Sequence, residues 1–158
     1  MKLYLVQHGE AKSKEQDPDC SLTDTGVKQT KKIAAWLGRQ AVPISVIYHS
    51  LKKRADQTAE IFEIRLAPTN GVTAMVGLKP NDDVLPVAEK LEETDEPIMI
   101  IGHLPFLNRL ASLLVTGNQE IGVISFINSG VVCLERMNDT WSVAWVVDPD
   151  LLPEPSEL

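Results

Sequence analysis

The chain has 158 residues, of which 44% are hydrophobic and 23% charged, with a net charge of −7 at pH 7. This is typical of a single globular domain, which we expect over residues 1–150, followed by a loosely held acidic tail at 151–158. The negative charge argues against binding of nucleic acid or anionic membranes. No apolar run reaches the length of a membrane span or a signal-peptide core. Two distant cysteines, Cys20 and Cys133, argue against a disulfide framework and favour a reducing, cytoplasmic compartment.

The charge is unevenly distributed. Residues 1–54 hold ten Lys and Arg against five acidic residues, whereas residues 55–158 hold five against seventeen. We interpret the positive N-terminal third as a localised site for an anion. The alternative is that the lysines lie on solvated helix faces, and we prefer this alternative for Lys28, Lys31 and Lys32. Four lysines flank the chemistry-bearing residues described below: Lys12, Lys14, Lys52 and Lys53.

Strand and helix patterns alternate along the first part of the chain. Lys2–Gln7 is a short apolar run that predicts a buried strand. After a polar loop, Thr23 caps a predicted helix that ends near Gly38. Residues 44–49 predict a second strand, and Ser50 begins a second helix.

The middle of the chain continues the alternation. Residues 66–81 are punctuated by Gly and Pro and are expected to be irregular. Residues 97–102 predict a strand that is buried on both faces, and residues 105–114 a helix with Pro near its first turn. Between the irregular segment and this strand, Asp82 or Asp83 is expected to cap a third helix. Its predicted inward positions are Val84, Leu85, Ala88 and Leu91.

The last third contains three β-rich runs, at 123–127, 131–136 and 141–147, which predict strands added at a sheet edge. Strands alternating with helices before them predict an α/β domain. We expect a three-layer sandwich in which helices flank a largely parallel central sheet.

Histidine and arginine side chains follow three of the predicted strands. His8 and His103 each come directly after an apolar strand, and Arg54 lies near the start of the helix after another strand. The carboxyl ends of parallel strands meet at one edge of a sheet, where sites assemble. Two imidazoles, a guanidinium and a helix start at that edge predict a phosphate site.

Each of these residues also has a purely structural interpretation. A single His at a strand end is more often structural than catalytic, and Arg54 alone would usually be a surface residue. Their coincidence at three strand ends outweighs these separate interpretations. His49 also ends a strand, and we assign it no role.

Four segments together resemble the histidine phosphatase superfamily, whose fold is like that of phosphoglycerate mutase. Gln7-His8-Gly9-Glu10-Ala11 is similar to the family's Arg-His-Gly signature. The similarity continues at three further segments: Leu22-Thr23-Asp24-Thr25-Gly26, Ser50 with Arg54-Ala55-Asp56-Gln57-Thr58, and Gly102-His103-Leu104-Pro105. Their spacing and the short chain resemble the SixA-like phosphohistidine phosphatases in particular.

The resemblance implies a role for each matching residue. His8 would attack phosphorus and become transiently phosphorylated. Arg54 and His103, with Gln7, would bind the phosphoryl oxygens and stabilise charge in the transition state. No metal and no other cofactor would be required.

A nitrogen leaving group must receive a proton, and the loop after the first strand offers two carboxyl groups, Glu10 and Asp17. Relative to Leu22-Thr23, Asp17 matches the loop acid of the SixA-like branch. It therefore ranks above Glu10 as the expected proton donor.

This chain departs from the family pattern at two arginine positions, which are Gln7 and Ser21 here. Gln can donate a neutral hydrogen bond but no charge. A hydrogen bond to a charged group contributes about 1.5–3 kcal/mol, so its loss would slow turnover roughly ten- to a hundred-fold. Lys12, Lys14 or Lys53 are candidates to compensate from the rim of the site.

The expected function is a phosphatase acting on phosphohistidine in a protein partner, or on a small phosphorylated molecule. One alternative is a phosphate-binding or regulatory module whose catalysis is weak or lost because of Gln7. A second is a small-metabolite phosphatase or mutase, which the shortness of the chain disfavours because long insertions would be needed to enclose a metabolite.

Overall fold

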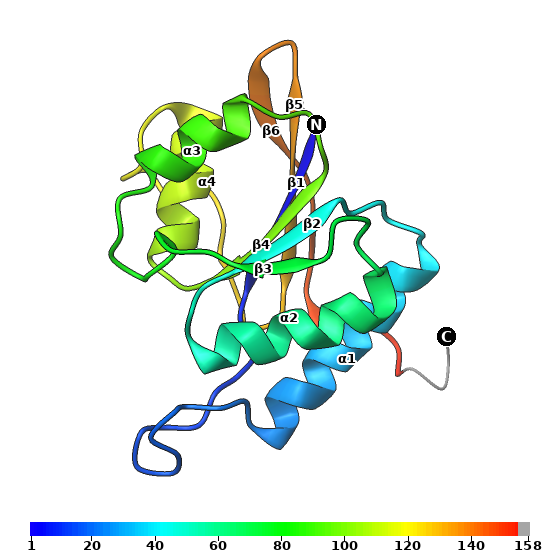
Figure 1. The fold of residues 1–158 in the computed structure, drawn as a ribbon. Helices are drawn as coiled ribbons and strands as arrows, with labels where there is room; N and C mark the ends of the chain where they lie inside the picture. The colour runs from blue at the N-terminus through cyan, green and yellow to red at the C-terminus, as the bar shows by residue number, and fades with distance from the viewer. Residues whose placement is uncertain (155–158) are drawn as a thin grey trace.

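In the computed structural model, residues 1–154 are described, so residues 155–158 of the predicted tail lie outside the described residues. A six-stranded sheet, in the order β3-β2-β4-β1-β5-β6, lies between two pairs of helices (Figure 1). The strands are β1 (Lys2–Gln7), β2 (Val46–His49), β3 (Val72–Ala74), β4 (Ile98–Gly102), β5 (Val131–Met137) and β6 (Thr140–Val147). The helices are α1 (Asp24–Arg39), α2 (Lys53–Leu66), α3 (Leu85–Glu92), α4 (Phe106–Thr116) and the 3₁₀ turn η1 (Pro149–Leu151).

The predicted α/β class and largely parallel sheet are confirmed. β4 pairs in parallel with both β1 and β2, and β2 pairs in parallel with β3. β5 and β6 form the antiparallel edge, with β5 paired to β1. The carboxyl ends of β1, β2 and β4 therefore meet at one edge of the sheet.

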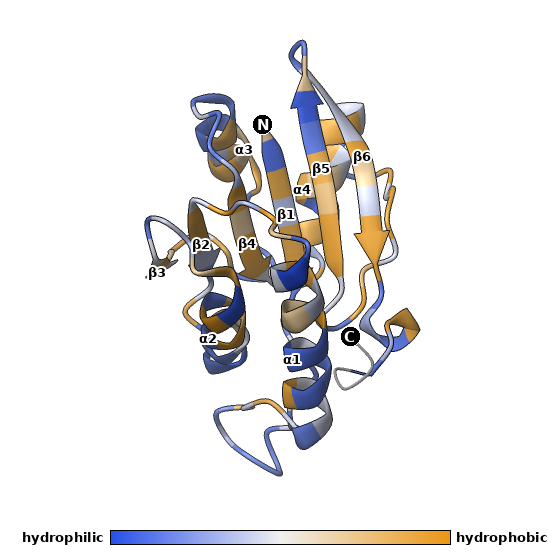
Figure 2. Ribbon diagram, turned by 90° about the vertical axis from the view of Figure 1, so that its right-hand side faces the viewer, coloured by the Kyte–Doolittle hydropathy of each residue, from blue (hydrophilic) through white to orange (hydrophobic). Residues whose placement is uncertain are grey.

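Strand β1 contributes alternate side chains to two cores, because successive side chains point to opposite faces. Leu3 and Leu5 of β1 are buried in the core beneath α3 and α4. Tyr4 and Val6 are buried in the core beneath α1 and α2. Figure 2 shows β4 and β5 as mainly hydrophobic, whereas the outer surface of α1 is hydrophilic.

The predicted strand at residues 123–127 is wrong. β1 already pairs with β4 on one side and β5 on the other, which leaves no free edge at the centre of the sheet. The segment instead packs Ile124 and Phe126 against the core beneath α3 and α4. An isolated bridge between Gln7 and Asn128 joins the residues that follow this segment to β1.

Three other details of the chain differ from the prediction. The expected irregular segment at 66–81 contains β3, which is held by its pairing with β2. Helix α2 begins at Lys53 rather than Ser50, whose hydroxyl has another partner. In α3 the expected inward residue Leu85 is exposed and Val87 is buried, since the helix starts later than its predicted Asp caps.

The last described residues pack on α1. Gln29 donates a hydrogen bond to Asp150 at 2.9 Å, and Lys32 pairs with Glu154 at 3.6 Å. Within residues 1–154, no helix combines the length and apolar composition needed to cross a bilayer.

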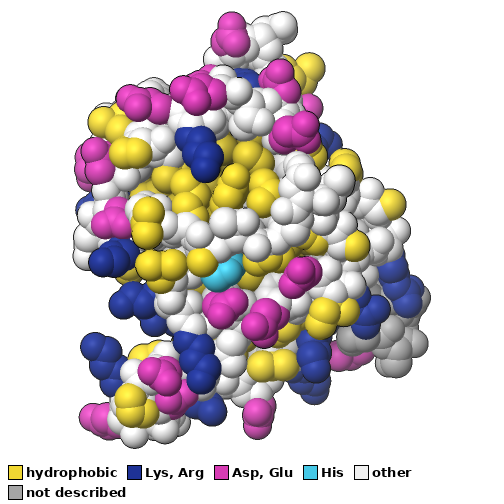
Figure 3. Space-filling model, viewed as in Figure 1, with side chains coloured by type: hydrophobic (Ala, Val, Ile, Leu, Met, Phe, Trp, Pro, Cys, Tyr) yellow, Lys and Arg dark blue, Asp and Glu magenta, His cyan; other side chains and the backbone are white. Residues whose placement is uncertain are grey.

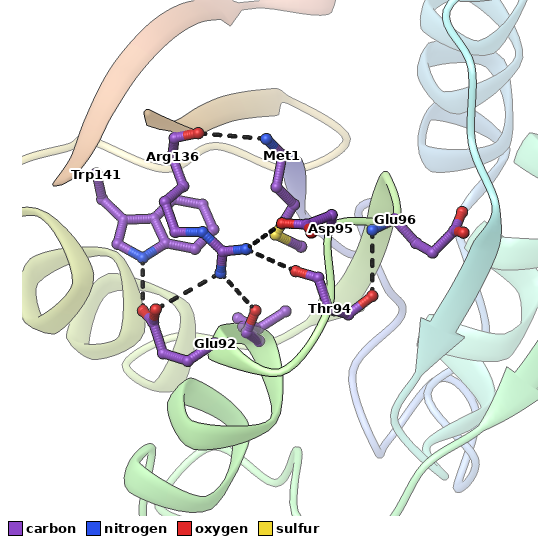
Figure 4. A network of polar contacts seen from close by, with 8 residues as sticks. Met1, Glu92, Thr94, Asp95, Glu96, Arg136 and Trp141 are labelled. Atoms are coloured by element: carbon purple, nitrogen blue, oxygen red, sulfur yellow. Dashed lines mark hydrogen bonds and ion pairs between the residues drawn. The ribbon is translucent and has the colours of Figure 1, made fainter. Parts of the chain in front are cut away.

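A polar network closes the amino end of the sheet, around Arg136 of β5 (Figure 4). Its guanidinium donates to the carbonyl oxygens of Leu91 and Thr94 at 2.8 and 2.7 Å. It also pairs with Asp95 at 2.8 Å and Glu92 at 3.5 Å. The network ties the end of α3 and the entry to β4 to the antiparallel edge.

Candidate active site

His8 lies directly after β1, and its ring is held in one tautomer. Nδ1 lies 2.7 Å from the Gly9 carbonyl oxygen, which can only accept, so Nδ1 carries the proton. The lone pair is therefore on Nε2, and Arg54 Nε donates to it at 3.3 Å. Burial and the Arg54 charge lower the pKa of His8 against the opposing effect of the Gly9 hydrogen bond. His8 is thus a neutral imidazole whose Nε2 carries no proton and accepts a hydrogen bond from Arg54.

His103 lies directly after β4, with its ring centroid 5.0 Å from that of His8. Its side chain is buried, and Nε2 lies 2.6 Å from Ser50 Oγ. Ser50 Oγ accepts from the Lys52 backbone N–H at 3.4 Å and can donate its own proton to His103 Nε2. The proton of His103 then lies on Nδ1, which is buried without a hydrogen-bond partner among residues 1–154.

The first turn of α2 orients Arg54 and supports the loop that carries His8. Thr58 donates to the Arg54 carbonyl at 2.7 Å and accepts from the Gly9 backbone N–H at 3.0 Å. Gln57 accepts from the Leu22 N–H at 2.8 Å. One helix therefore holds both the cation and the loop that follows the nucleophile candidate.

Helix α1 packs tightly against the same loop. Thr23 caps α1 as predicted, since its Oγ1 accepts from the Gly26 N–H at 3.0 Å. A Cβ at position 26 would collide with the Glu10 backbone, so this approach requires glycine. The Thr23 N–H also donates to the Glu10 carbonyl at 3.0 Å. The backbone after His8 is consequently fixed by two helix starts.

The two candidate proton donors have different surroundings. Asp17 accepts from the backbone N–H groups of Asp19 and Ser21 and from the Ser21 hydroxyl. These hydrogen bonds, chiefly the one from the Ser21 hydroxyl, lower the pKa of Asp17 to about 2. Glu10 Oε2 accepts one hydrogen bond, from Thr23 Oγ1 at 2.6 Å. Asp17 is thus a brace within its own loop, whereas Glu10 sits two residues from His8.

Gln7, at the last position of β1, has a buried side-chain oxygen, Oε1, without a hydrogen-bond partner within residues 1–154. It pairs in register with Gly102, the residue before His103. A buried polar atom without a partner is costly unless a ligand or solvent satisfies it.

A groove of about 490 Å³ opens beside Arg54. Four lysines and one arginine line it: Lys12, Lys14, Lys52, Arg54 and Lys79. Asp82 is the acidic residue among its lining residues. In Figure 3 the lower-left lobe is separated from the body by a hollow with Lys and Arg side chains around it. A second cavity of about 350 Å³, with Leu51, Met75 and Val76, shares Lys52, Lys79 and Asp82 with this groove.

The structure brings His8, Arg54, His103 and Gln7 to one edge of the sheet. Neither candidate proton donor, Asp17 or Glu10, is among the residues that line the groove. Ser50 is a functional residue that was not predicted from the sequence, although it lies in one of the segments that resemble the family. The signal was available, since Ser50 is a polar residue directly after a predicted strand, as His8 and His103 are. No group of three or more potential metal ligands occurs within residues 1–154.

The family model of the histidine phosphatase superfamily (branch 1) matches residues 3–75, which contain His8 and Arg54. Together with the relatives described next and the observed fold, this match supports a SixA-like histidine phosphatase as the kind of protein that the chain is similar to. These similarities support a phosphatase as the class of enzyme.

Particular relatives match almost the whole chain. Phosphohistidine phosphatase SixA of Escherichia coli K12 is 27% identical over 154 residues, covering 94% of each protein. The solved structure of the protein histidine phosphatase SixA with tungstate matches with a TM-score of 0.84 and 25% identity, over 95% of this chain and 98% of that one. An α-ribazole phosphatase from Shigella flexneri matches with a TM-score of 0.76 at 15% identity, over 94% and 97%, which shows a common fold alone.

Proposed function

We propose that the chain is a phosphatase that hydrolyses phosphohistidine on a protein partner through a phosphorylated His8. The observation that carries the proposal is the tautomer of His8. Its Nδ1 proton is donated to the Gly9 carbonyl, and its unprotonated Nε2 accepts a hydrogen bond from the Arg54 guanidinium. A neutral imidazole nitrogen next to an anion-binding cation is suited to attack a phosphoryl group.

In the first step, Nε2 of His8 forms a bond to phosphorus while the bond from phosphorus to the leaving nitrogen breaks. In the second, water attacks the phosphorylated His8, which releases inorganic phosphate and restores the free imidazole. Arg54 and the Nδ1–H of His103 would donate to the phosphoryl oxygens in both steps. We propose that these side chains make a metal ion unnecessary.

The groove favours a protein over a small metabolite as the source of the phosphoryl group. Its cationic lining is continuous with apolar surface at Leu51, Met75 and Val76, of which Leu51 and Val76 are largely exposed. Positive charge with adjoining apolar area suits a folded partner that presents acidic and apolar side chains around its phosphohistidine.

For the departing imidazole, Glu10 is the better proton donor. The carboxylate of Asp17 is engaged by three hydrogen bonds within its own loop, which lower its pKa to about 2 and hold it in place. Glu10 is exposed on the loop that follows His8 and has one side-chain hydrogen bond. We therefore assign the proton transfer to Glu10.

The test is to trap the intermediate. The protein is incubated with a phosphohistidine protein labelled with ³²P, quenched without acid and digested. The label is expected on the peptide that contains His8 and is expected to be absent from His8→Ala. His49→Ala, which changes a buried histidine at the end of β2, serves as the control and should retain the label. Label retained in His8→Ala would refute the nucleophile assignment.

Gln7 supports a second candidate, a module that binds phosphate groups without turning them over. Gln7 contributes no charge where the family signature has Arg, and its buried Oε1 has no partner within residues 1–154. In this case the protein would bind phosphohistidine or inorganic phosphate, but no label would accumulate on His8 and no phosphate would be released.

A further inference from the structure

The candidate phosphate site has little positive charge of its own. His8 is neutral because its pKa is lowered by burial and by Arg54. His103 is neutral because burial, followed by the charges of its neighbours, lowers its pKa to about 3. Gln7 is uncharged, so of these four side chains only Arg54 is a cation at neutral pH. A phosphoryl group carries nearly two negative charges, so a single guanidinium leaves it undercompensated.

Lys52 is a lysine that both lines the groove and is hydrogen-bonded to the inner part of the site. It lines the groove together with Arg54. Its backbone N–H donates to Ser50 Oγ, which is hydrogen-bonded to His103. The backbone of Lys52 is therefore held next to the buried His103. Its ammonium charge also contributes to the lowered pKa of His103, together with burial, which is the largest cause, and the charge of Arg54.

The neighbouring Lys53 differs in its surroundings. It is the first residue of α2, it is not among the residues that line the groove, and its charge acts on Asp17. Two adjacent lysines of equal charge therefore face different parts of the loop and groove.

We propose that Lys52 supplies the bound phosphoryl group with the second positive charge, in addition to Arg54. Because Lys52 is exposed at the N-terminus of α2, its flexible side chain can approach an anion held between Arg54 and His103 without a change in the fold. The charge missing at Gln7 is thus provided from the start of a different element. This inference rests on the proposed phosphate chemistry of the site, but it does not require turnover.

The first test measures binding of inorganic phosphate by calorimetry and kcat/KM with a small aryl phosphate. Lys52→Met should weaken phosphate binding and lower kcat/KM by about tenfold, the loss expected for one charged contact at a partly solvated site. Lys52→Arg should retain most of both. Lys53→Met, which removes the same charge one residue away, should change each by less than about threefold. Equal effects of Lys52→Met and Lys53→Met would overturn the proposal.

The second test asks whether Lys52 substitutes for a charge at position 7. Gln7→Arg should tighten phosphate binding and raise turnover by up to roughly a hundred-fold. In that background, Lys52→Met should cost less than about threefold, because the phosphoryl group then has a second cation. Independent, multiplying effects of the two substitutions would contradict the proposal, since a merely structural Lys52 would be insensitive to residue 7.

The outcomes separate this inference from the proposed function. If no variant turns over any phosphorylated substrate but Lys52→Met still weakens phosphate binding, the phosphatase assignment fails and the role of Lys52 stands. If Lys52→Met slows a phosphohistidine protein but not the aryl phosphate, Lys52 contacts the partner protein instead, and the inference is wrong.

Discussion

The two ends of the central sheet use arginine in opposite ways. At the amino end, the Arg136 side chain is 9% exposed and bonds two carbonyl oxygens and two carboxylates. At the carboxyl end, Arg54 donates from Nε to His8 and lines an open groove. Buried polar groups are normally satisfied, so the end at which Gln7 Oε1 and His103 Nδ1 lack partners within residues 1–154 is the end prepared for a ligand.

The charges of the two ends follow the same division. Around Arg136 the neighbouring side chains are acidic, as at Glu92 and Asp95. Around Arg54 the groove is lined by lysines. Thus part of the positive charge of the N-terminal third lies at the carboxyl end of the sheet, and part of the negative charge of the remainder lies at its amino end. An arginine among carboxylates stabilises the fold, whereas an arginine among lysines attracts an anion.

The largest expected effects come from exchanging each arginine for methionine. Arg54→Met should lower kcat/KM by about a thousandfold, because it removes the main charge aimed at the phosphoryl oxygens, while leaving the urea midpoint almost unchanged. Arg136→Met should leave kcat/KM intact and destabilise the protein by about 2 kcal/mol, because two partly buried carbonyl oxygens lose their donor. Phosphatase assays and urea unfolding measure both quantities.

The division of roles between the two arginines would be wrong if either substitution changed the quantity expected of the other. A loss of turnover in folded Arg136→Met would mean that the amino-end network also shapes the site. Strong destabilisation by Arg54→Met would mean that Arg54 is chiefly a structural contact between α2 and β1.

A smaller effect is expected at the two buried serines that flank β2. Ser50→Ala removes the donor to His103 Nε2, so the proton of His103 can move away from Nδ1. We expect kcat/KM to fall about tenfold and Ser50→Thr to restore most of it. Ser45→Ala, at the amino end of the strand, removes a partner of Asn70 and should keep full activity. ¹⁵N NMR of the His103 ring should show the change of tautomer in Ser50→Ala alone.

An unchanged tautomer with lost activity in Ser50→Ala would contradict this explanation. Equal losses in Ser45→Ala and Ser50→Ala would indicate that the activity responds to the stability of β2 rather than to His103.

The sequence predicted those features that depend on local patterns. β1 and β4 are recognisable as apolar runs, and the polar residue after each run marks the edge where His8 and His103 meet. The Thr23 cap is similarly local, since one hydroxyl serves an N–H three residues away. Such features require no knowledge of which strands are neighbours.

Features that depend on neighbours were missed. Residues 123–127 have the composition of a strand, but β1 has no free edge to pair with them. β3 has only three residues and exists because β2 offers it an edge. The role of Asp17 was likewise hidden, because a carboxylate that braces its own loop and one that delivers a proton look the same in a sequence.

The smallest and most selective effects should separate the two loop carboxylates. A phosphohistidine needs a proton on its leaving nitrogen, whereas an aryl phosphate with an acidic phenol leaves without one. Glu10→Gln should therefore lower kcat/KM about tenfold for phosphohistidine and little for such an aryl phosphate. Asp17→Asn should change the ratio of the two rates by less than about threefold, because Asp17, with its pKa of about 2, is ionised between pH 5 and 8 in any case. Any loss of kcat/KM in Asp17→Asn should be shared by both substrates, since the substitution loosens the loop at Ser21 rather than removing a proton.

A loss of kcat/KM confined to phosphohistidine in Asp17→Asn, with Glu10→Gln unaffected, would assign the proton transfer to Asp17. It would also require the loop to rearrange when the partner binds.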